Sequence, residues 1–216
     1  MSPRRNAMPK KLKLATVWLD GCSGCHMSLL DIDERLLDLL AHVDLVYSPL
    51  VDPKPFPEDV DIALVEGAVS SDEDLHKIRM VRERSKTLVA LGDCAVTSNV
   101  PGMRNPILVR DVLLRAYEEN VDGPVTNNMP GMGNRILARR VLPRAHEENG
   151  GGPRRGEIPS EQLPRLLPYV RPVHEIVAVD VFLPGCPPPA DAIFAMLSAL
   201  VEGRTPDAAG LSRFGK

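Results

Sequence analysis

The sequence predicts an α/β protein whose mainly parallel sheet is covered by helices on both faces. Short apolar runs alternate with amphipathic segments along the chain, as they do in proteins built from strand–helix units. The 216 residues, 44% of them hydrophobic and 25% charged, suffice for one globular domain with a buried core. No apolar run approaches the roughly 18 residues that a membrane span requires. We therefore expect a globular chain without a membrane span.

The first part of the chain supplies three predicted strands and one predicted helix. Residues 12–19 are β-branched, aromatic and apolar, which is typical of a strand. Residues 26–41 place leucines at helical spacing with acids between them, which predicts an amphipathic helix. Residues 43–51 form a second predicted strand, which ends before three closely spaced prolines. Residues 61–65 are a third strand, short and apolar enough to be buried.

The next elements continue the alternation. Ser71 and the three acids after it predict the start of a helix that extends to residue 84, because a serine caps the free amides and acids favour the first turn. Residues 87–91 and 175–182 are predicted as further strands. Residues 189–201 carry Leu, Ile, Phe and Met at helical spacing and predict the helix that closes the core.

Charge and terminal composition indicate where the domain begins and which partners it lacks. Residues 1–12 are a basic tail in which two adjacent arginines are not followed by the apolar stretch of an export signal. We expect one domain over 13–203, a tail over 204–216 and a cytoplasmic location. The net charge of −3 provides no basic field for nucleic acid.

A tandem duplication interrupts this pattern. Residues 101–124 and 130–153 align without gaps at an offset of 29. In the first copy Asn105 is predicted to cap a helix with Pro106 at its first position. In the second copy Pro143 falls in mid-helix, where proline costs about 3 kcal/mol. We interpret the second copy as a bent surface insertion; the reverse assignment of the two copies stays open.

Four cysteines are the candidate site residues. Cys22 and Cys25 follow the first predicted strand, Cys94 follows the strand 87–91, and Cys186 follows the last strand. Ligands bind at the carboxyl edge of an open parallel sheet, because the loops converge there. The cysteines are therefore expected to lie close together although they span most of the sequence.

Three kinds of thiol site fit this pattern. A zinc ion with four thiolates favours two C-x2-C knuckles, and the sequence has one. Buried thiols or a redox disulfide between Cys22 and Cys25 is the second kind. The third is a [4Fe–4S] cluster held by all four cysteines, which we favour because glycine-rich loops offer backbone amides to cluster sulfurs.

Seven motifs in order and spacing resemble one family, the small subunit of cytoplasmic NAD-reducing (bidirectional) [NiFe] hydrogenases. They are residues 18–31 (WLDGCSGCHMSLLD), 65–69 (VEGAV), 92–95 (GDCA), 100–105 (VPGMRN), 172–175 (PVHE), 182–188 (FLPGCPP) and 213–215 (RFG). The resemblance implies a flavodoxin-like domain in which Cys22, Cys25, Cys94 and Cys186 hold the [4Fe–4S] cluster proximal to the Ni–Fe site. It implies a separate large subunit that carries the Ni–Fe site, and diaphorase subunits with flavin and Fe–S clusters that reduce NAD+. This chain then carries no catalytic residue of its own.

Two details of the motifs refine the resemblance. The related quinone-reductase subunit of respiratory complexes typically has adjacent cysteines in its first motif, whereas two residues separate Cys22 from Cys25 here. Many periplasmic relatives place a glutamate before the first cysteine, and this chain has Gly21. Four cysteines suffice for one cluster only. The alternatives are a cluster-bearing subunit of a complex I-like quinone reductase and a zinc-stabilised binding module.

Other polar and aromatic residues near the motifs carry weaker expectations. Trp18 is expected to pack in the core beside the cysteine loop. Glu66 is either a proton relay or cluster-loop residue, or an ordinary hydrogen-bonding acid. His26 is not expected to be a ligand, because four cysteines already complete the set. His174 is expected to be a packing or interface residue, and Arg104 a contact to a partner or to the cysteine loops.

Overall fold

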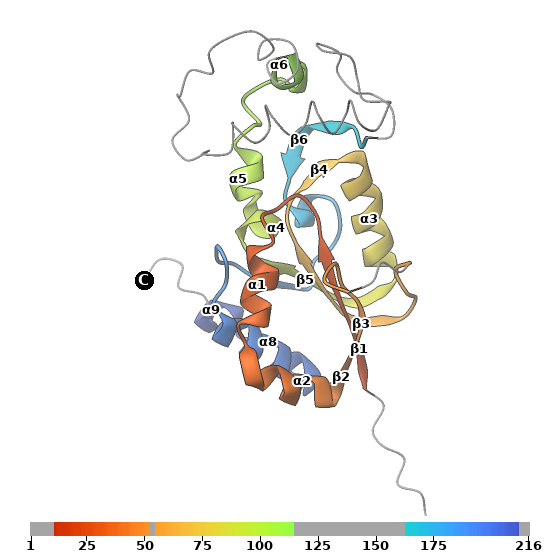
Figure 1. Cartoon of the computed structure of the whole chain (residues 1–216), viewed down its shortest axis with the longest axis vertical. Coiled ribbons are helices and arrows are strands. Elements are labelled where there is room, and N and C mark those ends of the chain that lie inside the picture. The colour runs from red at the N-terminus through yellow and green to blue at the C-terminus, as the bar shows by residue number, and fades with distance from the viewer. Residues whose placement is uncertain (1–10, 52–54, 115–162, 212–216) are drawn as a thin grey trace, which may run out of the picture. The chain divides into compact units, whose positions relative to one another are not determined.

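The computed structural model describes residues 11–51, 55–114 and 163–211, in two compact units. One unit combines residues 1–105 with 169–216, and the other comprises 106–168. The first unit contains the central sheet (Figure 1) and, by residue number, all four cysteines. Most of the duplicated segment, from residue 115 to the end of the second copy, falls outside the described residues.

A five-stranded parallel sheet forms the centre of the first unit, in the order β2-β1-β3-β5-β7. Its strands are β1 (Leu12–Trp18), β2 (Val43–Tyr47), β3 (Val60–Glu66), β5 (Ser85–Leu91) and β7 (Val181–Leu183). This is the flavodoxin-like strand order. The chain adds β2 on one side of β1 and then adds β3, β5 and β7 on the other side, so the strand order reverses between β1 and β3. The predicted α/β fold is confirmed, and the carboxyl ends of β1, β3, β5 and β7 meet at one edge.

Helices cover both faces of this sheet (Figure 1). The helices and turns of the first unit are α1 (Gly24–Leu30), η1 (Asp33–Arg35), α2 (Leu36–His42), α3 (Asp72–Glu83), α4 (Asp93–Thr97), α5 (Asn99–Gly102), η3 (Val173–Glu175), α8 (Ala190–Val201) and α9 (Ala208–Leu211); α6 (Val109–Leu114) belongs to the other unit. One core lies between the sheet and the helices α1, α2 and α8, where Leu64 and Leu91 meet Leu29 and Met196. Alternate residues such as Ala63 point to the other face, which α3 covers.

Helix α3 begins as the sequence predicts. The side chain of Ser71 accepts from the backbone N–H of Asp74, and the Asp74 carboxylate accepts from the backbone N–H of Ser71 at 3.0 Å. This reciprocal capping box satisfies two amides that the first turn leaves free. On the buried side, Ile78 and Val81 are fully shielded from solvent. The start of the helix is therefore confirmed by its cap and its burial.

The predicted helix over 26–41 is wrong as a single element. The chain forms α1, the short turn η1 and α2 instead, and Asp33 between α1 and α2 has a left-handed φ of 60°. Helical spacing of leucines did not reveal the break, because short segments on either side keep a helical pattern. Within α2, Leu37 is 71% exposed while Leu39 is buried, so the two residues lie on opposite faces of the helix.

The predicted strand over 175–182 is largely wrong. Most of that segment follows the turn η3, and only β7 at its end joins the sheet. Two strands escaped prediction, β4 (Val69–Ser71) and β6 (Leu166–Arg171), which pair in a small second sheet. Both are short, and prolines flank or interrupt β6, so period-two alternation is weak. Helix α9 lies within the predicted tail over 204–216.

Asn105 does not cap a helix, which corrects the prediction from the duplicated segment. Helix α6 begins only at Val109. The Asn105 side chain instead pairs with the backbone of Val170 in β6: its Nδ2 donates to the carbonyl at 2.9 Å, and its Oδ1 accepts from the N–H at 2.7 Å. A carboxamide presents the same donor and acceptor as a peptide group, so it completes the hydrogen bonding of the strand.

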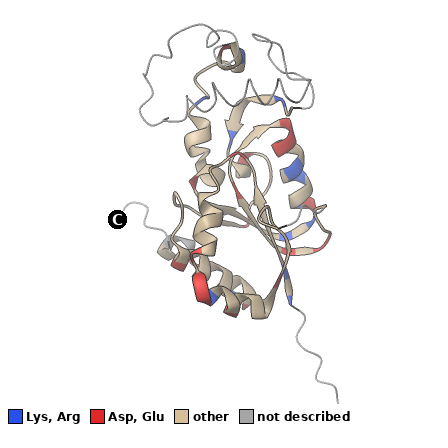
Figure 2. Cartoon of the chain, in the orientation of Figure 1, with Lys and Arg blue, Asp and Glu red and all other residues tan. Residues whose placement is uncertain are grey.

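Charged residues are unevenly distributed over the described elements. Helix α3 carries many of both signs, whereas α1 and α5 carry none (Figure 2). Across residues 11–51, 55–114 and 163–211, no helix has the length and apolarity to cross a membrane.

Candidate metal centre

The structure brings all four cysteines to the carboxyl edge of the sheet. Cys22 lies in the connection from β1 to α1, Cys25 in the first turn of α1, Cys94 in the first turn of α4 after β5, and Cys186 in the loop between β7 and α8. All four are free thiols; Cys25 is buried, Cys94 is half-buried, and the other two are exposed. The three cysteine-bearing segments therefore lie at the same edge of the sheet, as the sequence predicts.

The thiols lie close enough to affect each other's ionisation. Burial raises the pKa of the Cys25 thiol far above its ordinary value, and the charges of Glu66 and of the other three cysteines raise it further. Burial also raises the pKa of Cys94 to about 11, with contributions from Cys186 and Cys22. Both thiols are thus protonated at neutral pH in the metal-free chain, and a bound metal must displace their protons.

Two of the loops are bound to each other by paired hydrogen bonds. The backbone N–H of Asp93 donates to the carbonyl of Gly185 at 2.9 Å, and the Asp93 carboxylate accepts from the N–H of Gly185 at 2.7 Å. Asp93 precedes Cys94 and Gly185 precedes Cys186, so this pair fixes the separation of two cysteines. The sequence did not reveal it, because the partners are 92 positions apart.

The first loop is joined to the last through helix α1. The hydroxyl of Ser28 donates to the carbonyl of Pro188 at 2.5 Å, and both groups are buried. Ser28 is one turn along α1 from Cys25, and Pro188 is two residues after Cys186. All three cysteine-bearing loops therefore form one hydrogen-bonded assembly.

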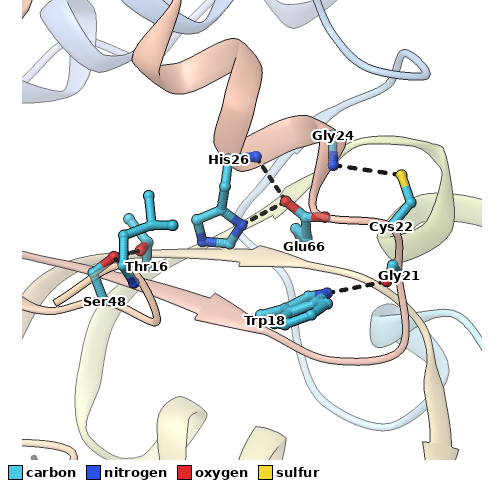
Figure 3. Close-up of polar contacts among 9 residues, drawn as sticks. Thr16, Trp18, Gly21, Cys22, Gly24, His26, Ser48 and Glu66 are labelled. Carbon is cyan, nitrogen blue, oxygen red and sulfur yellow. Dashed lines mark hydrogen bonds and ion pairs between the residues drawn. The ribbon is translucent and has the colours of Figure 1, made fainter. Parts of the chain in front are cut away.

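Glu66, at the end of β3, holds the start of helix α1 (Figure 3). Its Oε2 accepts from the backbone N–H of His26 at 2.7 Å and lies 2.5 Å from Nδ1 of the same residue. The residue before α1, Ser23, makes no capping bond with its side chain, so Glu66 supplies the missing acceptor from 40 positions away. The side chains of Glu66 and His26 are each 2% exposed. Glu66 is thus a hydrogen-bonding acid at the start of α1, and a proton-relay role for it stays a prediction.

Two glycines allow the loops to approach one another. Gly67 has φ of +92°, and a Cβ there would come within 2.8 Å of the backbone of Leu19. Gly92 has φ of +83°, and its Cβ would come within 2.2 Å of the sulfur of Cys25. Any side chain at either position would separate the β1 loop from its neighbours.

Three N–H groups point at the sulfurs. The backbone N–H of Gly24 donates to Sγ of Cys22 at 3.4 Å, and Nδ2 of Asn99 donates to Sγ of Cys186 at 3.5 Å. The backbone N–H of Val100 bonds to the Cys94 thiol and lowers its pKa, opposing the larger effect of burial. Donors of this kind stabilise negative charge on sulfur.

The expectation for Trp18 is half wrong. The indole is 44% exposed rather than in the core, but it does lie beside the cysteine loop, where Nε1 donates to the carbonyl of Gly21 at 3.2 Å (Figure 3). His174 packs edge-on against Phe182, with ring centroids 5.7 Å apart, as expected of a packing residue.

Arg104 contacts β4 within the first unit. Its Nη2 donates to the carbonyl of Ser70 at 3.1 Å, and burial lowers the pKa of the guanidinium. A pocket of about 580 Å³ lies beside α5 and is bordered by Ser98, Asn99 and His174. Within the described residues, no group of three or more His, Cys, Asp or Glu side chains is arranged to hold a single metal ion.

The sheet order and the cysteines from three loops define a flavodoxin-like protein that carries its candidate site at the carboxyl edge of the sheet. The chain belongs to the family described as NADH ubiquinone oxidoreductase, 20 Kd subunit, whose pattern matches residues 22–200. All four cysteines lie within the matched range.

Individual relatives of this chain are subunits of hydrogenases. The chain is 41% identical over 195 residues to the delta subunit of the NAD-reducing hydrogenase HoxS of Cupriavidus necator, covering 90% of this chain and 80% of that protein. It is 35% identical over 196 residues to a subunit of the F420-non-reducing hydrogenase vhu of Methanocaldococcus jannaschii, again over 90% of this chain but only 58% of the relative. The predicted resemblance to small subunits of NAD-reducing [NiFe] hydrogenases is thus confirmed.

Solved structures with a similar fold are also hydrogenase chains. A chain of an NAD+-reducing [NiFe]-hydrogenase in the H2-reduced state superposes with a TM-score of 0.75 and 37% identity, covering 95% of this chain and 99% of the other. An [NiFeSe]-hydrogenase chain of Dm. baculatum, 16% identical with a TM-score of 0.52, shares the fold; the match covers 89% of this chain and 63% of that one.

Proposed function

We propose that this chain is the electron-transfer small subunit of a NAD-reducing [NiFe] hydrogenase. Cys22, Cys25, Cys94 and Cys186 bind one [4Fe–4S] cluster, which passes electrons between the Ni–Fe site of a separate large subunit and a diaphorase module that reduces NAD+. The observation that carries the proposal is the convergence of four free thiols from three loops at one sheet edge.

The residues present fit such a cluster. Four cysteines complete the ligand set of one cubane, and the chain has no further thiol. Backbone and side-chain N–H groups already point at three of the four sulfurs. When bound, the cluster supplies one-electron chemistry that none of the twenty side chains provides at this site.

The chain's own residues join the loops that carry the ligands. Glu66 fixes the first turn of α1 and with it Cys25, while Asp93 joins the Cys94 loop to the Cys186 loop. Because these bonds are buried or half-buried, we expect them to limit the movement of the ligands. Cys25 is shielded from solvent, which separates that side of the site from water.

The surface around the cysteine edge suits a protein partner. Exposed apolar side chains border the loops, and they include Met27 of α1, Val100 and Met103. Helices α1 and α5 carry no charge, so little charge would lose its hydration on contact (Figure 2). We assign this face to the large subunit, because the two exposed cysteines, Cys22 and Cys186, lie on it.

The compartment and the domain boundaries follow from the same proposal. A subunit that delivers electrons to NAD+ belongs in the cytoplasm, and four unpaired thiols suit a reducing compartment. We retain one domain over 13–203, with the duplicated segment as an elaboration of it.

A complex I-like quinone reductase subunit is the second candidate. It shares the matched family and would use the same cysteines. The C-x2-C spacing of Cys22 and Cys25 and the 41% identity to a hydrogenase subunit favour the hydrogenase.

Anaerobic purification of the intact complex tests the proposal. We expect at least about four iron and four acid-labile sulfide per copy of this chain, because the partner subunits add further iron, together with a nickel-containing large subunit and hydrogen-dependent reduction of NAD+. Zinc without iron would overturn the cluster. Iron and sulfide in a complex that lacks nickel and reduces quinone would instead support the second candidate.

Replacement of one ligand tests the assignment within the complex. Cys186→Ser is expected to lower the iron content or change the EPR spectrum of the cluster. Thr97→Val is a matched control, because Thr97 lies in α4 near the site while its hydroxyl donates to the helix carbonyl of Asp93 at 2.9 Å. An unchanged spectrum in the cysteine variant would contradict its role as a ligand.

A further inference from the structure

The short break between α4 and α5 has an unusual backbone. Ser98 and Asn99 are consecutive residues with positive φ, 67° and 28°. Left-handed conformations cost roughly 1–2 kcal/mol for residues other than glycine, although asparagine tolerates them better than most. The surrounding structure therefore holds this turn in place, and the groups that the turn orients are candidates for a functional role.

The turn orients two hydrogen-bond donors toward cysteines of two different loops. Nδ2 of Asn99 donates to Sγ of Cys186 at 3.5 Å, across 87 positions of sequence. The next residue, Val100, donates its backbone N–H to Cys94. A continuous helix through Ser98 would engage the Val100 N–H within the helix, so the break is what frees this donor.

We propose that Asn99 is a positioning residue that raises the reduction potential of the cluster by donating a hydrogen bond to the Cys186 sulfur. The proposal rests on the proposed function, since it requires that Cys186 bind the cluster. Reduction adds negative charge that is shared with the ligating sulfurs, so an N–H donor stabilises the reduced state more than the oxidised state. Loss of the donor should then make reduction harder.

The carboxamide of Asn99 suits both requirements of the position. It tolerates the left-handed backbone, and it carries a donor at the right reach from the turn. Aspartate has the same shape and backbone tolerance but offers only acceptors when ionised. Glycine accepts the backbone and offers no side chain. Asn99→Asp and Asn99→Gly therefore remove the hydrogen-bond donor while keeping a backbone that tolerates the turn.

The experiment is an EPR-monitored redox titration of the cluster in the intact complex. Asn99→Gly is expected to lower the ratio of reduced to oxidised cluster at fixed ambient potential by several-fold. A tenfold fall corresponds to about 59 mV for a one-electron couple. Asn99→Asp is expected to lower it further, because it replaces the donor with a negative charge. Thr97→Val should leave the potential unchanged, since that hydroxyl bonds a helix carbonyl.

Iron and sulfide analysis of each variant distinguishes a failure of the role of Asn99 from a failure of the proposed cluster-binding function. A loaded cluster whose potential in Asn99→Gly equals that of the wild type would overturn the role of Asn99 and leave the proposed function intact. A shift in Asn99→Asp alone would show a charge effect and would also overturn the hydrogen bond. Absence of iron from the wild-type complex would overturn the proposed function itself.

Discussion

Replacing Glu66 tests whether a side chain from β3 holds the cysteine-bearing helix. In the Glu66→Ala variant, the backbone N–H and the imidazole of His26 lose their partner, and both are buried. Each buried polar group left without a partner costs about 1–3 kcal/mol, so we expect a loss of about 2–6 kcal/mol in the free energy of unfolding. Domains of this size have a total of about 5–15 kcal/mol.

The conservative variant and an exposed control sharpen this prediction. Glu66→Gln keeps the volume and one oxygen that can accept from His26, so it should cost only about 1 kcal/mol. Glu73→Ala removes an exposed acid whose ion pair with Lys77 spans one helical turn, and should cost less than about 0.5 kcal/mol.

Urea denaturation of the metal-free chain, followed by fluorescence, measures these values. Trp18 is the only tryptophan and contacts the carbonyl of Gly21 in the same loop, so its emission reports on the region that Glu66 supports. A double-mutant cycle with His26→Phe isolates the imidazole, and we expect a coupling of about 1–3 kcal/mol. Equal losses in Glu66→Ala and Glu66→Gln, or a loss below about 1 kcal/mol in the alanine variant, would refute the capping role.

Three further predictions concern separate features of the fold. Gly92→Ala should abolish cluster loading, measured as iron and sulfide per chain, because its Cβ would lie 2.2 Å from the Cys25 sulfur; full loading would contradict this. Burial raises the pKa of Asp180, but a backbone N–H of β5 and the guanidinium of Arg82 outweigh it and lower the pKa. That stabilisation is present above the ordinary pKa of 3.8 and is lost as the pH falls through the lower pKa of the folded state. The difference in free energy of unfolding between the wild type and Asp180→Asn should therefore shrink in acid, and a difference that stays constant with pH would contradict this. Ser71→Ala should cost about 1 kcal/mol in urea denaturation through loss of the helix cap, and no change would contradict the capping box.

Local sequence determined the features that depend on neighbouring residues. The capping box at Ser71 lies within four positions, so the sequence alone predicts the start of α3. Strands β1 and β3 are mostly apolar, and β5 is apolar from Leu88 to Leu91, because parallel strands are buried on both faces. The alternation of these segments with helices placed the four cysteines at the ends of strands, and from there at one sheet edge.

Contacts between distant positions of the sequence could not be predicted and appear only in the folded chain. Glu66 meets His26, Asp93 meets Gly185, and Asn99 meets Cys186 over separations of 40 to 92 positions. No local pattern encodes such a contact, because it depends on how loops from different strands converge.

Exposure and backbone breaks also depended on tertiary context. Trp18 was expected in the core, but its place at the end of β1 leaves it 44% exposed. The break at Asp33 separates two short helices, and neither a proline nor a glycine marks it in the sequence. The fold class and the four candidate thiols could therefore be predicted from local sequence patterns. The folded chain determined which side chains hold and face them, because hydrogen bonding between loops is set by three-dimensional proximity.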